Sequence, residues 1–174
     1  MPRILVTPLS AVPQTIARHE PSHLVSLLSP EHMIETPDGV EAHRHLKLGM
    51  NDIADAFAGD APPALRHIAS LLEFGRAWNA DAPMLIHCWA GISRSTAAAY
   101  IVLCDRLGHG HEAHIARELR ARAPHAYPNR LMVKLADGAL GRGGRMVDAV
   151  EAMGRGRIVS EGELTELPLA FEPA

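Results

Sequence analysis

One stretch near the middle of the chain decides the fold: Pro83-Met-Leu-Ile-His-Cys88-Trp-Ala-Gly91-Ile-Ser-Arg94-Ser-Thr96. Its first six residues form an apolar run of strand type, as expected of a central strand that is covered on both faces. A loop with one glycine follows, and a helical pattern begins at Arg94. A strand that passes through such a loop into a helix points backbone N–H groups and the positive end of the helix dipole at one spot. The stretch therefore predicts an anion-binding loop.

Two side chains of this loop suit phosphate chemistry. Cys88 stands at the first loop position, where the positive field of the loop favours a thiolate. Arg94 stands in the first helical turn and can offer two parallel N–H donors to phosphate oxygens, a geometry that lysine cannot reproduce. The sequence therefore places a nucleophile and an oxyanion clamp on one loop.

Short apolar runs and longer amphipathic runs alternate around this stretch. The short runs predict strands over 3–7, 23–28, 43–48 and 83–88, and the longer runs predict helices over 12–19, 63–78, 95–107, 112–122, 129–140 and 146–153. This alternation is typical of an α/β fold with a largely parallel central sheet of four to five strands, flanked by helices.

The chain of 174 residues has a suitable length for one domain. We expect residues 1–153 to form it. Residues 154–174 alternate Gly, Arg and Glu with little periodicity, so we expect them to form a loosely held C-terminal extension.

Composition excludes several classes of partner. The net charge is -3 and the basic residues are dispersed, so we expect no nucleic acid partner. No apolar run reaches the roughly 18 residues of a membrane-spanning helix, so we expect no membrane partner. The two cysteines lie in apolar segments and no leader pattern precedes them, which indicates a cytoplasmic protein. Nothing in the sequence indicates an oligomeric state.

The pattern His-Cys-x5-Arg-Ser after an apolar strand resembles the signature of the cysteine-dependent protein tyrosine phosphatase superfamily. The whole chain looks like a compact, bacterial-type dual-specificity-like phosphatase. The resemblance implies that Cys88 forms a cysteinyl-phosphate, that Arg94 binds the transferring phosphoryl group, and that no cofactor is needed. It also implies that His87 supports the loop and that the Ser95 hydroxyl donates to the departing thiolate. The implied phosphate-binding loop consists of Cys88, Trp89, Ala90, Gly91, Ile92, Ser93 and Arg94.

Phosphate ester cleavage also needs a carboxylic acid that gives a proton to the leaving oxygen. Relatives carry this Asp on a loop upstream of the cysteine. Asp52 follows a predicted strand whose carboxyl end should open on the same sheet edge as the Cys88 loop. We therefore expect Asp52 to be the acid, with Asp55 and Asp60 as rivals on the same segment.

Three other features have competing interpretations. Asn129 matches an Asn that relatives place near the pocket, where it would position water, but Asn is equally suited to cap a helix. Cys104 falls on the apolar face of its helix, so we expect it in the core. The histidines around His43 and His109 lack the spacing of a zinc site, so we expect exposed side chains and no metal.

The resemblance implies a phosphomonoester hydrolase of the protein-tyrosine or dual-specificity kind. Its substrate would be a phosphorylated protein or a small phosphomonoester. The loop contains no lysine, which disfavours phosphoinositides; these and nucleotides stay alternatives. A module that binds phosphoproteins without turnover is another alternative, although the presence of both Cys88 and Arg94 favours an enzyme.

Overall fold

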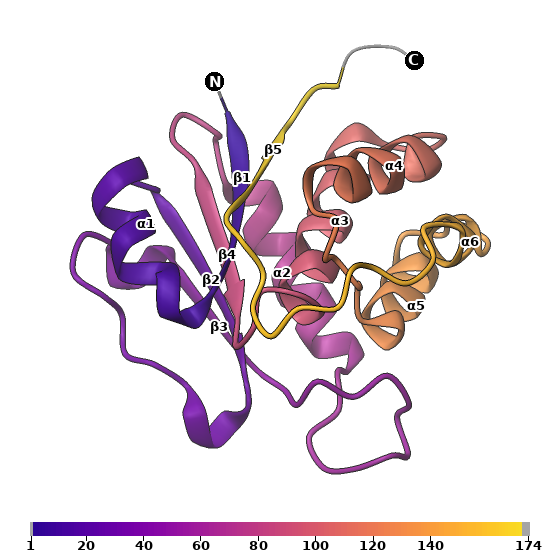
Figure 1. Ribbon diagram of the computed structural model, residues 1–174, viewed down its shortest axis with the longest axis horizontal. Helices are drawn as coiled ribbons and strands as arrows, with labels where there is room; N and C mark the ends of the chain where they lie inside the picture. The colour runs from indigo at the N-terminus through magenta and orange to yellow at the C-terminus, as the bar shows by residue number, and fades with distance from the viewer. Residues whose placement is uncertain (1, 172–174) are drawn as a thin grey trace.

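The computed structural model describes residues 2–171 and contains one mixed sheet with helices on both faces (Figure 1). The strands are β1 (Arg3–Pro8), β2 (His23–Leu28), β3 (His45–Gly49), β4 (Met84–Cys88) and β5 (Thr165–Pro168). The α-helices are α1 (Val12–His19), α2 (Leu65–Ala77), α3 (Arg94–Leu107), α4 (Glu112–Arg122), α5 (Arg130–Ala139) and α6 (Arg145–Ala152). Short 3-10 turns occupy Leu9–Ala11, Pro30–His32 and Ala42–Arg44.

The sheet has the strand order β3-β2-β4-β1-β5. The pairs β1–β4, β2–β4 and β2–β3 are parallel, and only β5 runs antiparallel, along the edge of β1. The predicted α/β class with a largely parallel sheet is confirmed. Because the parallel strands all end at one edge, Cys88 lies beside Pro8, and His87 lies between Thr7 and Ser26.

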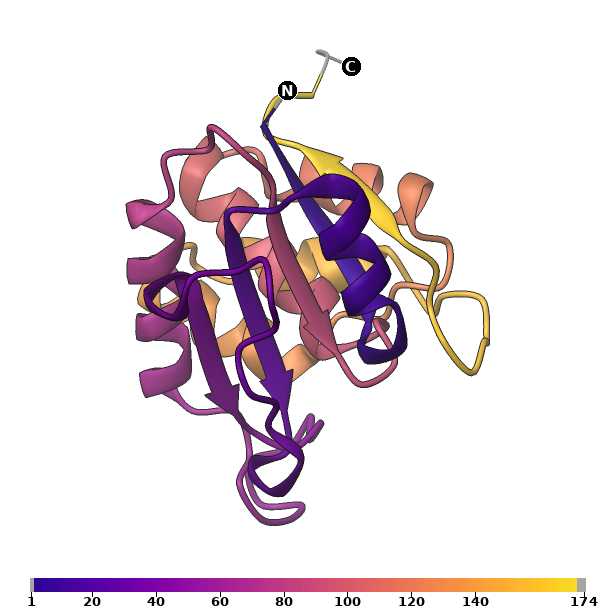
Figure 2. The same cartoon turned by 90° about the vertical axis from the view of Figure 1, so that its left-hand side faces the viewer.

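The central strand β4 is buried on both faces, as its apolar sequence predicts. Leu85 faces a small core layer formed with Leu5 and Leu24 and closed by α1, which lies in front of the sheet in Figure 2. Met84 and Ile86 point to the opposite face, where the larger core lies under α2 to α6. This alternation places the strands between two helical layers.

Most element boundaries agree with the sequence pattern, with one clear difference at the third strand. Residues 42–44, which include His43, form a 3-10 turn, so β3 begins only at His45. Helix α2 begins at Leu65, after Ala64, whose backbone N–H donates to His67 Nδ1. Across residues 2–171 there is no helix of the length and apolarity that a membrane crossing requires.

The segment after Met153 contacts both the sheet and the Cys88 loop. Gly162 N–H donates to Ala90 O, and the β5 strand that follows is paired with β1. Both contacts join the end of the described chain to the start of the sheet and to the Cys88 loop. Residues 172–174 of the expected extension, and Met1 of the expected domain, lie outside the described residues. The division into a domain 1–153 and an extension stays a prediction.

Candidate active site

The loop from Cys88 to Ser93 makes its tightest approach at Gly91. This residue has a φ of 71°, and a Cβ there would lie 2.6 Å from Pro8 N and 2.8 Å from Thr7 C. A side chain would therefore be strained by the backbone conformation and would clash with β1. The glycine lets the loop fold back against the sheet edge.

Carbonyl groups of the loop are hydrogen-bonded to chain segments outside it. These bonds run from Leu9 N to Trp89 O at 3.1 Å, from Gly162 N to Ala90 O at 2.8 Å, from Tyr127 N to Ile92 O at 2.9 Å and from Asn129 N to Ser93 O at 3.1 Å. Carbonyls held outward in this way turn the amide N–H groups toward the inside of the loop, which is the arrangement of an anion-binding concavity.

Cys88 ends β4 and lines a cavity of about 510 Å³. The thiol is nearly buried, with 2% of the residue exposed. Its Sγ lies 3.1 Å from Ser95 Oγ, in the first turn of α3. A hydroxyl so close can donate a hydrogen bond to a thiolate.

Arg94 lines the same cavity and is 6% exposed. Its Nη1 donates to Met50 O at 2.8 Å, which fixes one side of the guanidinium. Its Nε is buried, and among the described residues it has no hydrogen-bond partner. A buried donor without an acceptor is costly, and an anion in the cavity would satisfy it.

Asp52 also lines the cavity. Its Oδ1 accepts hydrogen bonds from Ser93 Oγ at 2.7 Å and from Asn129 Nδ2 at 2.9 Å. The carboxylate is thus tied to the Cys88 loop itself. All three carboxylates are exposed, but the rivals Asp55 and Asp60 do not line this cavity, and Asp55 Oδ1 accepts from Phe57 N instead.

Asn129 caps a helix and also lines the cavity, while its role in positioning water stays a prediction. Its Oδ1 accepts from Met132 N at 3.0 Å, which caps the start of α5. Its Nδ2 donates to Asp52 Oδ1 and to Ile53 O, which holds the Asp52 segment over the cavity. One side chain therefore joins a helix start to the candidate acid.

His87 is fully buried beneath the loop. Its Nδ1 lies 3.2 Å from Cys88 O, and its Nε2 lies 2.6 Å from Ser26 Oγ. Burial lowers the pKa of His87 to about 4, against which the hydrogen bond to Cys88 acts only partly. The ring is therefore neutral at pH 7, and it holds the backbone of the nucleophile rather than carrying charge.

Aromatic side chains flank the mouth of the cavity. Trp89 is 55% exposed and makes an edge contact with His32, with ring centroids 5.6 Å apart. Tyr127 lines the same cavity, and the guanidinium groups of Arg130 and Arg155 lie 5.9 and 5.8 Å from its ring centroid. The sequence pattern did not identify Tyr127, because its loop comes next to the cavity only through the packing of α4 and α5.

Comparison with family models and with curated proteins finds no match. Solved structures do match along most of the chain. A human tyrosine phosphatase-like serine/threonine/tyrosine-interacting protein is 18% identical, with 80% of this chain and 91% of that chain covered and a TM-score of 0.63. DUSP15 is 17% identical, with 92% and 96% covered and a TM-score of 0.61. Human DUSP28 is 18% identical, with 81% and 94% covered and a TM-score of 0.61.

These likenesses concern the course of the backbone, since the identities are low. They cover between 80% and 92% of this chain in these three structures. The chain thus has the α/β fold of the dual-specificity and tyrosine phosphatases.

Proposed function

We propose that the protein is a cysteine-dependent phosphomonoester hydrolase of the protein-tyrosine or dual-specificity kind. One observation carries the proposal: Cys88, Asp52 and the partly unpartnered guanidinium of Arg94 line the same cavity at the carboxyl edge of the sheet. They are a nucleophile, an acid and an anion clamp, which together are what a two-step phosphoryl transfer requires.

In the first step the Cys88 thiolate attacks phosphorus. A bond forms between Sγ and phosphorus while the bond from phosphorus to the ester oxygen breaks. Protonated Asp52 gives its proton to that leaving oxygen. Arg94 and the inward amide groups of the loop stabilise the charge on the three remaining oxygens. The product alcohol or phenol leaves, and a cysteinyl-phosphate remains.

In the second step a water molecule attacks the cysteinyl-phosphate. Asp52, now a carboxylate, takes a proton from the water. The bond between phosphorus and Sγ breaks, and the Ser95 hydroxyl at 3.1 Å donates to the departing thiolate. Inorganic phosphate leaves and the thiolate is restored. Asn129, which holds Asp52 in place, is positioned to orient the water.

A phosphoprotein-binding module without turnover is the second candidate. The likeness to the tyrosine phosphatase-like interacting protein supports it at the level of the fold.

The candidate enzyme would work in the cytoplasm, where a free Cys88 stays reduced. Its substrate would be a phosphorylated protein or a small phosphomonoester, with phosphoinositides and nucleotides as alternatives.

Hydrolysis of para-nitrophenyl phosphate tests the proposal. We expect turnover without added metal, and loss of turnover by at least about 10⁴-fold in Cys88→Ser, because a hydroxyl does not ionise at neutral pH. Cys104→Ser is the matched control, since Cys104 is equally buried but lines no part of this cavity, and it should keep near-normal rates. Turnover that survives in Cys88→Ser would contradict covalent catalysis. If the protein bound a phosphopeptide but did not hydrolyse it, that result would favour the phosphoprotein-binding module.

A further inference from the structure

A chain of four hydrogen-bonded polar side chains crosses β3, β2 and β4 and ends at the backbone carbonyl of Cys88. Ser26 Oγ on β2 lies between two histidines, 2.6 Å from His87 Nε2 on β4 and 2.8 Å from His45 Nε2 on β3. Thr36 Oγ1 lies 2.9 Å from His45 Nδ1. Ser26 and His87 are fully buried and His45 is 9% exposed, so these groups are shielded from water. We call Thr36, His45, Ser26 and His87 the histidine relay.

The protons of the relay can be placed by elimination. Cys88 O only accepts, so His87 Nδ1 carries a proton, and the Nε2 of the neutral ring is bare. Bare Nε2 takes the single hydroxyl proton of Ser26. Ser26 Oγ then accepts from the N–H at Nε2 of His45.

The same reasoning extends to the outer end of the relay. With a proton on Nε2, the Nδ1 of a neutral His45 is bare and accepts from the Thr36 hydroxyl. Every donor points toward Cys88, and the two rings hold opposite tautomers.

Both rings are neutral in the native protein. Burial lowers the pKa of His45 to about 4, with Lys47 acting in the same direction and Glu35 against it. Burial likewise lowers the pKa of His87 to about 4, and His45 and Arg94 add to this shift. The neutral forms that the proton assignment needs are therefore present at pH 7.

We propose that His45 is a positioning residue for the nucleophile, acting through Ser26 and His87. This inference rests on the proposed function. His45 donates its Nε2 proton to Ser26 Oγ. The Ser26 hydroxyl therefore donates its own proton to Nε2 of His87. That donation keeps the His87 proton on Nδ1, where it holds the carbonyl of Cys88 and with it the first peptide of the loop. Without His45, Ser26 can accept from His87 instead, and the bare Nδ1 then faces the carbonyl oxygen.

Two substitutions separate this role from simple packing. His45→Phe keeps the ring volume and removes the donor to Ser26. In His45→Gln the side-chain amide can still donate to Ser26 Oγ. We expect kcat for an aryl phosphate to fall about tenfold in His45→Phe, the size of one hydrogen bond lost, and to stay within about threefold in His45→Gln. KM should change little, because the phosphate-binding groups are retained.

His67→Phe is the matched control. His67 is also a buried histidine, but its partners are the backbone groups of Ala64, at the start of α2, and of Gly49, at the end of β3, and not Ser26 or His87. Its loss should lower stability and leave kcat unchanged at a temperature where the protein is folded. Equal losses of kcat in His45→Phe and His67→Phe would overturn the proposal.

Ring ¹⁵N NMR of the unmodified protein gives a readout that does not depend on activity. We expect a protonated Nδ1 in His87 and a protonated Nε2 in His45, and a mixed tautomer signal for His87 in His45→Phe. The same tautomer in both rings, or an unchanged His87 signal in that variant, would overturn the relay. A protein without turnover but with opposite tautomers would instead disprove the proposed function and keep the relay.

Discussion

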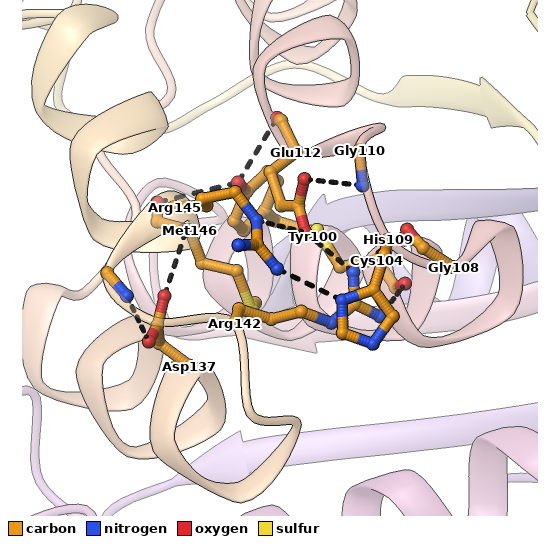
Figure 3. Close-up of polar contacts among 11 residues, drawn as sticks. Tyr100, Cys104, Gly108, His109, Gly110, Glu112, Asp137, Arg142, Arg145 and Met146 are labelled. Carbon is orange, nitrogen blue, oxygen red and sulfur yellow. Dashed lines mark hydrogen bonds and ion pairs between the residues drawn. The ribbon is translucent and has the colours of Figure 1, made fainter.

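Two buried polar regions of the molecule are built from different chemistry. The histidine relay consists of neutral groups and ends at Cys88 O. The second region, which we call the ion-pair cluster, is formed around Glu112, Arg142 and Arg145. It joins α3, α4, α5 and α6 (Figure 3). At its centre Arg142 Nη1 lies 2.7 Å from Glu112 Oε1, and both side chains are 3% exposed.

The side chains of the ion-pair cluster contact several segments of the chain, while Arg142 Nε is buried and has no hydrogen-bond partner among the described residues. Arg142 also donates to Gly108 O and Cys104 O, and Arg145 Nε lies 3.6 Å from Glu112 Oε1. Desolvation raises the pKa of Glu112, but the hydrogen bonds and charge of Arg142 outweigh it and hold the pKa below its usual value. None of these residues lines the cavity at Cys88.

The histidine relay and the ion-pair cluster differ in whether their buried side chains carry charge. Next to Cys88 the supporting ring of His87 is neutral, and the charged side chains that line the cavity are Asp52, Arg94 and Arg130. The buried ion pair of Glu112 and Arg142 instead lies among the helices, away from this cavity. We therefore expect changes in the cavity and its supports to affect turnover, and changes in the ion-pair cluster to affect stability.

The largest expected effect is that of Arg94→Lys. A lysine cannot reproduce the fixed guanidinium that bonds Met50 O and presents Nε to the anion, so kcat/KM for an aryl phosphate should fall about 10⁴-fold. Arg106→Lys is the control, because Arg106 also donates to backbone carbonyls, at Gly75 and Trp78, but lines no part of the cavity. Similar rates for both variants would remove Arg94 from the proposed mechanism.

Arg142→Met tests the ion-pair cluster. It leaves the carboxylate of Glu112 buried without its main partner, so the free energy of unfolding should fall by about 3 to 5 kcal/mol in urea titrations. The rate per folded molecule should stay unchanged. Adding Glu112→Gln should recover part of the stability, since the unpaired charge is then gone. A loss of turnover in the folded single variant would show that the two regions are coupled.

Asp52→Asn should have a smaller effect on rate, and one that depends on the substrate. An alkyl phosphate, whose leaving group needs a proton, should lose about 10²-fold in kcat. Para-nitrophenyl phosphate should lose much less, because its phenolate leaves without a proton. Asp55→Asn is the control on the same loop, since the Asp55 carboxylate accepts from Phe57 N and lines no part of the cavity. If Asp55→Asn showed the dependence on leaving group, the acid would have to be reassigned.

The smallest effect concerns pH. A histidine whose pKa is lowered in the native state from 6.5 to about 4, as for His45 and His87, stabilises the fold above pH 6.5. That contribution is lost as the pH falls from 6.5 toward 4, by about 2 kcal/mol per such histidine between pH 7 and pH 5. His45→Phe should lose about 2 kcal/mol less than the unmodified protein over this interval in urea titrations. An identical pH dependence would show that His45 is not buried as a neutral ring.

Prediction from sequence succeeded where the information is local. The strand, loop and helix from Pro83 to Thr96 are contiguous, so the pattern indicates the loop geometry directly. Asp52 is separated in sequence from Cys88, yet it follows a parallel strand, and parallel strands end at one edge. The structure accordingly brings both residues to one cavity.

Contacts that depend on strand register could not be predicted in this way. Ser26, His45 and His87 meet only because β2 lies between β3 and β4 at one particular register. From sequence we expected the histidines around His43 to be exposed, but His45 faces inward. The four-residue strand β5 was missed because its Thr-Glu-Leu-Pro sequence has no clear strand pattern, and pairing with β1 determines its structure.

The contact between Gly162 and the Cys88 loop determines when the loop can be completed during synthesis of the chain. Ala90 O can accept its hydrogen bond only after Gly162 has been synthesised. Likewise, Ser10 Oγ can donate to Glu161 only after the ribosome has added about 150 further residues. While the chain emerges from the ribosome, Cys88 and Arg94 are already outside, but the loop lacks one of the bonds that turn its amides inward. The nascent chain therefore carries every reacting group before it holds the finished loop.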